Sequence, residues 1–315
     1  MSDKIIKGQI LFGINNIYTV SVDNKLYQCR IKGKILKQSD GLYNPLTAGD
    51  IVDIEPDSLS SGHGTITSLY ERKNVFTRWN RKRMSLQLMA ANIDILFAIT
   101  TPNEPPFRPR FLDRMLLSEE ENYEKIIIMN KADISPSPDV EERIADYNRI
   151  GIKVIKSSAV TLEGIEEIKN LMEGKYCVFA GQSGVGKSTL INIIMGNNIQ
   201  KTGEISYKYC RGRHTTNYSV LIPYKDNGGI IDTPGIREIF IEKVVPEKLG
   251  FMFTEFREFI KLCEFIGCSH IEETGCGVKH GVENGLIHED RYRTYLKLYA
   301  EMTELAEEVY GCPYS

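Results

Sequence analysis

Short stretches of alternating apolar and polar residues fill the first 75 positions, a pattern typical of half-buried β-strands. These stretches cover Gly8–Val22 with a turn at 13–16, Lys25–Ile31, Asp50–Glu55 and Thr65–Tyr70. Turn-forming pairs such as Asp23-Asn24 separate them. About five strands without a convincing helix predict a small β-barrel of the OB or SH3-like type over residues 1–75.

From Ile93 onward, apolar runs of strand length alternate with stretches of helical periodicity. The predicted strands are 93–100, 125–129, 152–155, 176–180 and 229–231, and the predicted helices are 110–120, 140–150, 162–172 and 190–195. This alternation predicts a mostly parallel sheet covered by helices on both faces, with ligands at the carboxyl ends of the strands. We therefore expect an α/β domain over residues 93–245.

Two further segments flank this domain in the sequence. Residues 76–92 are predicted to form a connector, part of a basic stretch that begins at Arg72 and surrounds Trp79. Such a stretch is either a linker or a phosphate-contacting loop. Residues 246–315 form a third, mostly helical domain that ends in a predicted helix over 290–310. The fold class is thus multidomain.

Charge is distributed unevenly over the 315 residues, although the formal net charge is only −3. Residues 1–91 carry 13 Lys/Arg and 8 Asp/Glu, whereas residues 251–315 carry 6 and 12. A basic N-terminal module on an otherwise acidic chain indicates a polyanionic partner for that module. Lys25, Arg30, Lys32, Lys34 and Lys37 lie on or just after one predicted strand, as either a nucleic-acid-binding face or a solvated basic face.

Composition excludes membrane and secreted disulfide-rich proteins. With 42% hydrophobic and 26% charged residues the chain is typical of a soluble globular protein. No apolar run approaches the roughly 20 residues that span a bilayer, and Met1–Lys4 does not open a signal peptide. The odd count of seven cysteines favours a reducing compartment. We therefore expect a cytoplasmic protein without membrane contact.

A glycine-rich loop between an apolar strand and a predicted helix has the spacing of a phosphate-binding P-loop. Its residues are Gly181, Gln182, Ser183, Gly184, Val185, Gly186, Lys187, Ser188 and Thr189. Backbone N–H groups of such a loop surround phosphate oxygens, and the helix N-terminus adds partial positive charge. Lys187 is predicted to reach the β- and γ-phosphates and Ser188 to ligate Mg²⁺.

Two loops that precede the P-loop in the sequence carry guanine-recognition chemistry. Asn130, Lys131, Ala132 and Asp133 follow a predicted strand and match N-K-x-D, and Ser158-Ala159 follows the next strand. The Asp133 carboxylate can accept two hydrogen bonds from guanine, whereas adenine presents no such pair of donors. Ser158-Ala159 is similar to the short loop whose backbone contacts guanine O6.

The remaining nucleotide motifs follow the P-loop. Asp232-Thr233-Pro234-Gly235 matches D-x-x-G, in which Asp232 holds Mg²⁺ through water and Gly235 contacts the γ-phosphate. A switch threonine is expected in 211–216, where Thr215 and Thr216 both remain open. Ordinary GTPases place N-K-x-D after D-x-x-G. Here it comes first, so the domain is predicted to be circularly permuted.

Water activation is the step for which the sequence offers the weakest motif. The residue after D-x-x-G is Ile236, where Ras-type GTPases use a glutamine to orient the attacking water. His214, beside the switch threonines, is the candidate to replace it. The alternative is that His214 packs the loop or contacts RNA.

Four potential metal ligands lie within 14 positions near the C-terminus. They are Cys263, Cys268, His270 and Cys276. Three thiolates and one imidazole form a complete tetrahedral set for a closed, structural Zn²⁺ site. The alternative is reduced free cysteines beside a surface histidine.

Together these motifs resemble the RsgA (YjeQ) family, over essentially the whole chain. The resemblance implies an OB barrel, a circularly permuted P-loop GTPase domain and a zinc-binding domain, with GTP or GDP, Mg²⁺ and one structural Zn²⁺ bound. It further implies GTP hydrolysis stimulated by the 30S ribosomal subunit, binding to 16S rRNA and a role in late 30S maturation. We expect a monomer.

Two other classes are weighed against this hypothesis. An ABC-type ATPase has a similar P-loop, but its L-S-G-G-type signature and Asp-Glu strand end do not occur in the sequence. A nucleotide-gated RNA-binding module with negligible turnover stays open.

Overall fold

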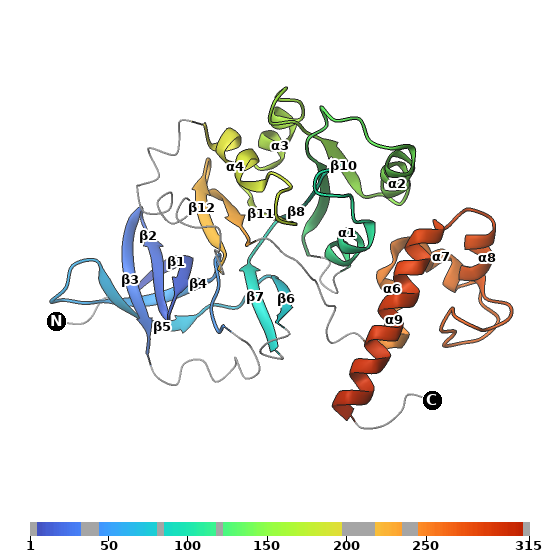
Figure 1. Ribbon diagram of the computed structural model, residues 1–315. Coiled ribbons are helices and arrows are strands. Elements are labelled where there is room, and N and C mark those ends of the chain that lie inside the picture. Colours follow the sequence, from blue (N-terminus) through green and yellow to red (C-terminus); the bar gives the residue numbers. More distant parts are fainter. Residues whose placement is uncertain are drawn as a thin grey trace. The chain divides into compact units, whose positions relative to one another are not determined.

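The computed structural model describes residues 5–32, 44–80, 85–117, 122–196, 218–234 and 245–310 (Figure 1). The chain forms two compact units. The first unit takes in residues 1–107, 120–137 and 154–238, and the second takes in 108–119, 138–153 and 239–315. Each unit is therefore built from separate segments of the sequence. Two segments from the middle of the chain, 108–119 and 138–153, pack with its C-terminal part.

The N-terminal part of the first unit is a closed five-stranded barrel, as predicted. Its strands are β1 (Ile6–Ile14), β2 (Ile17–Val22), β3 (Lys25–Ile31), β4 (Ile51–Pro56) and β5 (His63–Leu69). They are ordered β1-β2-β3-β5-β4, and β3 and β5 pair in parallel while the other pairs are antiparallel. This five-stranded closed arrangement is OB-like.

Asparagine and aspartate pairs form the tight turns of this barrel. Asn15 and Asn16 join β1 to β2, and Asp23 and Asn24 join β2 to β3, all with positive φ. Two successive positive φ angles are what a two-residue hairpin turn requires, and these residue types tolerate them. The alternating pattern buries Ile10, Val20, Cys29, Val52, Ile54 and Ile66 inside the barrel.

The predicted connector contains regular structure. Strands β6 (Val75–Asn80) and β7 (Ser85–Ala91) pair antiparallel as a two-stranded sheet. Arg72, counted among its basic residues, donates to both oxygens of buried Asp50 at 2.7 and 2.9 Å. This arginine therefore stabilises the fold, while Arg81, Lys82 and Arg83 lie outside the described residues.

A six-stranded sheet forms the rest of the first unit. Its order is β10-β9-β8-β11-β13-β12. The strands are β8 (Ile95–Thr100), β9 (Glu124–Met129), β10 (Lys153–Lys156), β11 (Tyr176–Gly181), β12 (Val220–Tyr224) and β13 (Gly228–Asp232). Parallel pairing joins β9, β8, β11 and β13, which confirms the predicted sheet, whereas β12 pairs antiparallel with β13 and was not predicted.

Two helices of the first unit were predicted, and one of them begins later than expected. Helix α4 (Lys187–Met195) follows the glycine-rich loop. Helix α3 begins at Ile165 and ends at Leu171, not at 162, because Leu162 and Gly164 both have positive φ. A Cβ at residue 164 would collide with the carbonyl oxygen of Lys156, so this position requires glycine.

The second unit consists of helices around its own apolar core. They are α1 (Pro109–Leu116), α2 (Pro138–Arg149), η3 (Pro246–Lys248), α6 (Leu249–Met252), η4 (Thr254–Phe256), α7 (Arg257–Ile260), α8 (Gly277–Glu283) and α9 (Glu289–Tyr310). Leu117, Phe253, Phe256, Tyr295 and Leu298 contribute to the core. No helix in the described part of the chain has the length and apolarity needed to cross a lipid bilayer.

Candidate nucleotide-binding site and metal centre

The glycine-rich loop has a backbone that only glycine fits at two points. Gly184 and Gly186 have φ of 86° and 90°. A Cβ on Gly186 would collide with the Asn130 side-chain amide, and one on Gly181 would collide with the Ile99 carbonyl. Loop 182–186 therefore joins β11 to α4 in the tight form that lets backbone N–H groups face a phosphate.

Lys187 lies buried at the first position of α4. Its Nζ donates to the carbonyl oxygens of Gly181 at 3.0 Å and Gln182 at 3.3 Å, which holds the ammonium over the loop. Burial lowers the pKa of Lys187, and nearby Asp232 opposes that shift. Among the described residues no carboxylate makes a hydrogen bond to this ammonium, and a cation held in this way is suited to a phosphate group.

Asp232 is the last residue of β13, and its carboxyl group interacts electrostatically with Lys187. Burial raises the pKa of its carboxyl to about 6, and Lys187 opposes the shift. Its Oδ1 is buried and has no hydrogen-bond partner among the described residues. An orphaned buried carboxylate oxygen fits a cation or a cation-bound water, so the residues present suit Mg²⁺.

Asn130 ties three segments of the site together. Its Nδ2 donates to the Val185 carbonyl in the glycine-rich loop at 2.8 Å. Its Oδ1 accepts from the Ser157 hydroxyl at 3.2 Å. The structure thus brings together the loops after β9, β10 and β11.

Asp133 is oriented by the loop after β10. The Ser158 hydroxyl donates to Asp133 Oδ1 at 2.5 Å and accepts from the backbone N–H groups of Val160 and Thr161. The remainder of the Asp133 side chain is exposed. A fixed, accessible carboxylate of this kind can accept the paired donors of a guanine edge.

A proline-rich loop after β8 also belongs to this site, although the sequence analysis missed it. Lys131, with φ of 60°, donates from Nζ to the Glu104 carbonyl at 2.5 Å. Pro105 is the nearest group to a Cβ built on Gly184. The run Pro102-Asn103-Glu104-Pro105-Pro106 directly after a strand was the available signal, since ligands bind at strand carboxyl ends.

Several predicted site residues lie outside the described residues. They are His214, Thr215, Thr216 and Gly235, together with Ile236.

The four predicted metal ligands come together in the second unit. Their ligand atoms all lie within 4.8 Å of one another. His270 Nδ1 is 3.6 Å from Cys263 Sγ and 3.5 Å from Cys276 Sγ. Tetrahedral Zn²⁺ with Zn–S bonds of about 2.3 Å and a Zn–N bond of about 2.0–2.1 Å requires nitrogen–sulfur separations of about 3.6 Å. The donor set and its geometry therefore fit a structural zinc ion.

Neighbouring groups hold this centre in place. Tyr292 donates its hydroxyl to the His270 carbonyl at 2.7 Å, and Tyr295 donates to the Ser269 carbonyl. Cys276 is the N-cap of α8, where its sulfur accepts from the Lys279 N–H. The partial positive charge of a helix N-terminus favours the thiolate form that metals require.

Two family models match the chain between residues 7 and 242. The family model "RsgA N-terminal domain" matches residues 7–66, and "RsgA GTPase" matches residues 69–242. The chain belongs to the RsgA GTPase family. Its activity is therefore Mg²⁺-dependent hydrolysis of GTP to GDP and phosphate, which rules out the ABC-type ATPase alternative.

Relatives of the RsgA GTPase family align with almost the whole chain. Proteins named "Small ribosomal subunit biogenesis GTPase RsgA" are 41% identical in Borrelia recurrentis, over 96% of this chain and 97% of that protein, and 36% identical in Caldanaerobacter subterraneus, over 97% and 98%. The solved structure of YjeQ from Thermotoga maritima matches with a TM-score of 0.71 and 30% identity, covering 95% of this chain and 99% of that one.

The circular permutation of the RsgA GTPase fold is also visible in a second solved structure. YloQ, described as a circularly permuted GTPase, matches with a TM-score of 0.67 and 28% identity, covering 96% of both chains. In the present chain, β9 and β10, with the loops that carry Asn130–Asp133 and Ser158, precede β11 and the glycine-rich loop, yet these three strands lie in one sheet. The permuted order predicted from the motifs is confirmed.

Proposed function

We propose that this protein is a GTPase of small-ribosomal-subunit biogenesis, which binds the 30S subunit through 16S rRNA and hydrolyses GTP faster when bound. Relatives at 41% identity over 96% of the chain, named for that process, are the observation that carries the proposal. The nucleotide site and the barrel support it. The protein acts as a monomer in the cytoplasm.

Each loop of the nucleotide site has a proposed role. Asp133 reads the guanine edge, with Asn130, Lys131 and Ala132 shaping its loop and Ser158-Ala159 completing the base pocket. Residues 181–186 and Thr189 surround the phosphates, and Lys187 neutralises the β- and γ-phosphate oxygens. Ser188 and Asp232 hold Mg²⁺, which when bound neutralises the charge that develops on the phosphates. Gly235 contacts the γ-phosphate.

Water positioning is assigned to the loop that precedes β12. Thr215 or Thr216 closes over the Mg²⁺ and γ-phosphate. His214 orients the attacking water, because Ile236 offers no hydrogen-bonding atom at the position of the Ras-type glutamine. Hydrolysis is therefore slow until the subunit positions His214 against the attacking water.

Measurement of GTP hydrolysis with and without purified 30S subunits tests the proposal. A GTPase of this kind shows slow intrinsic turnover and a large increase with subunits, which 50S subunits do not produce. Turnover that stays negligible in both conditions would instead support a nucleotide-gated RNA-binding module.

A further inference from the structure

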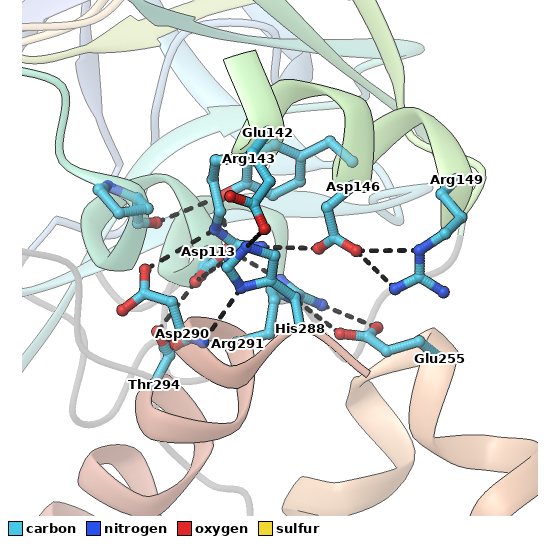
Figure 2. A network of polar contacts seen from close by, with 12 residues as sticks. Asp113, Glu142, Arg143, Asp146, Arg149, Glu255, His288, Asp290, Arg291 and Thr294 are labelled. Carbon is cyan, nitrogen blue, oxygen red and sulfur yellow. Dashed lines mark hydrogen bonds and ion pairs between the residues drawn. The ribbon is translucent and has the colours of Figure 1, made fainter. Parts of the chain in front are cut away.

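A buried cluster of charged residues lies in the second unit, apart from the metal centre (Figure 2). We call it the Asp113 cluster. Its members are Asp113 of α1, Arg143 and Tyr147 of α2, Glu255 of η4, and Arg291 and Thr294 of α9. Asp113 has no exposed surface, and both arginines are 2% exposed. None of these residues belongs to the nucleotide site or the metal centre.

Asp113 accepts hydrogen bonds from two other helices. Arg143 Nη2 donates to both of its oxygens at 2.9 Å, and Arg291 Nη1 donates at 2.9 Å. The Tyr147 and Thr294 hydroxyls donate at 2.6 and 2.9 Å. Burial raises the pKa of Tyr147, so the phenol keeps the proton that it donates. One carboxylate thus joins α1 to α2 and α9.

Arg291 extends the same cluster to the C-terminal helices. Its Nε and Nη2 donate to the two Glu255 oxygens at 2.6 and 2.9 Å. Its guanidinium lies 4.7 Å from the centre of the Phe253 ring, on the face of the apolar core. A second link to α2 is the hydrogen bond from Arg149 Nη1 to the Leu286 carbonyl, at 2.7 Å.

The chemistry of the cluster favours a geometric role over a stabilising one. Buried ion pairs add little net stability, because desolvation offsets their attraction. The apolar core of this unit already stabilises it. Charged, bidentate hydrogen bonds have strict geometry, whereas apolar contacts tolerate sliding. The cluster therefore fixes α1, α2, η4 and α9 in one register.

Both α1 and α2 continue directly from loops of the nucleotide site. Helix α2 begins at Pro138, which follows Asp133 by five positions. Helix α1 begins at Pro109, just after the loop whose Glu104 carbonyl accepts from Lys131. Short chain segments therefore connect these helices to the loops that carry Glu104 and Asp133.

We infer that the Asp113 cluster couples α1 and α2 to the C-terminal metal-binding module (residues 246–315), a role that we call the joint. When the ribosomal subunit contacts that module, the cluster makes α1 and α2 move with it as one body. Asp113 and Arg291 are then positioning residues for subunit-stimulated GTP hydrolysis. This inference rests on the proposed function.

The test compares Arg291→Leu with the matched control Arg114→Met in the full-length protein. Arg114 also joins α1 to α9, through Glu301 at 2.6 Å, but this pair is partly exposed. For Arg291→Leu we expect unchanged basal hydrolysis, GTP affinity and 30S affinity. Its maximal 30S-stimulated rate should fall about tenfold, a typical size for coupling between sites. The control should keep the wild-type stimulated rate.

The possible outcomes separate the joint from the proposed function. If wild-type protein is not stimulated by 30S subunits, the proposed function fails, whatever the variants do. If wild type is stimulated and Arg291→Leu is stimulated equally, the joint is overturned. Parallel loss of 30S affinity and stimulated rate also overturns it, since that pattern indicates docking alone. Equal loss in Arg114→Met overturns the specific role of the cluster.

A gentler variant applies if Arg291→Leu does not fold, as judged by metal content and thermal melting. Thr294→Val removes one hydrogen bond to Asp113 with little change in shape. We expect a loss of about threefold in the maximal stimulated rate, in proportion to one hydrogen bond of several. An unchanged stimulated rate in folded Thr294→Val overturns the inference.

Discussion

At the scale of single residues, the nucleotide site depends on side chains that are fixed by other side chains. Ser158 holds one oxygen of Asp133, and Asn130 connects the phosphate loop to the loop after β10. The Asp133 carboxylate is thereby oriented without any ligand. Preorganised acceptors of this kind favour one base over another, because a mismatched base leaves them unpaired.

Asp133→Asn should weaken GTP binding about 10- to 100-fold, since a neutral amide cannot accept two donors as a carboxylate does. Xanthosine triphosphate carries a carbonyl in place of the guanine amine, so the amide of the variant should bind it better than wild type does. Titration with labelled nucleotides measures both effects. Asp139→Asn, an exposed change in α2, is the control. Equal GTP affinity in Asp133→Asn and wild type would show that Asp133 does not read the base.

His214→Ala should keep GTP binding and 30S association but lose most of the stimulated rate. The reason is that the imidazole is proposed to orient water only when the subunit is bound. Single-turnover hydrolysis on 30S subunits measures the step directly. Full stimulated turnover in this variant would assign water positioning to another residue or to the ribosome.

At the scale of elements, the loop between β11 and α4 combines backbone strain with close packing. Gly186 has φ of 90° and leaves no room for a Cβ beside Asn130. Gly151 has φ of 86° but nothing within 4 Å of its Cβ position. These two glycines therefore separate the effect of a collision from that of backbone strain.

Gly186→Ala should reduce GTP affinity by at least about tenfold, because the Asn130 amide must leave its bond to Val185. Gly151→Ala carries the same φ penalty of about 1–2 kcal/mol but should bind GTP normally. Nucleotide titration and thermal melting of both variants check this. A Gly186→Ala protein with wild-type affinity would show that the collision is relieved elsewhere.

The region around the metal centre, which includes α7 and α8, should depend on the metal ion for its fold. Purified protein should contain about one zinc ion per chain, and Cys263→Ser or chelation should unfold the region around α7 and α8. Nucleotide affinity should change little, because the two sites lie in different units. Elemental analysis and hydrogen exchange measure both points. The control is Cys29→Ser in the barrel core, which should retain the metal. Metal-free wild-type protein with an ordered α8 would contradict the prediction.

At the scale of the whole molecule, residues 1–91 carry a net positive charge and residues 251–315 a net negative one. The basic residues of the barrel are not all available to a partner. Arg72 is committed to Asp50, and Lys32 pairs with Glu55 at 3.0 Å in an exposed position. Arg30 is exposed on β3, whereas Lys34 and Lys37 lie outside the described residues. Arg30 and Lys25, which is also exposed on β3, are thus the described residues of this set that remain available for a phosphate contact.

Arg30→Glu should weaken 30S binding about tenfold at low salt and lower the slope of log K against log salt concentration by about one. Lys169→Glu, a charge reversal outside the barrel at a half-buried lysine of α3, should leave both unchanged. Binding measured over a range of salt concentrations gives the slope. A salt-independent wild-type affinity would exclude phosphate contact as the main source of binding.

The sequence by itself determined the chemistry of this protein. The glycine-rich loop, Asn130–Asp133, Asp232 and the Cys₃His set were recognisable because each is a local pattern whose residues act together within a few positions. The barrel and the parallel sheet were predicted from periodicity, since burial on one or both faces leaves a direct mark on the sequence. Strand β12, the β6–β7 pair and the start of α3 were missed or shifted, because pairing partners and positive φ angles decided them.

Only the tertiary structure decided which distant side chains meet. Asn130 bonds Val185 at a separation of 55 positions, Arg72 bonds Asp50 at 22, and Arg291 bonds Asp113 at 178. No periodicity links such pairs, because their contact depends on how whole elements pack. The same holds for α1 and α2, which lie between strands in the sequence but pack with the C-terminal helices. Short sequence motifs contain the residues that carry the chemistry, whereas the buried polar contacts that fix their geometry form only when those segments fold together.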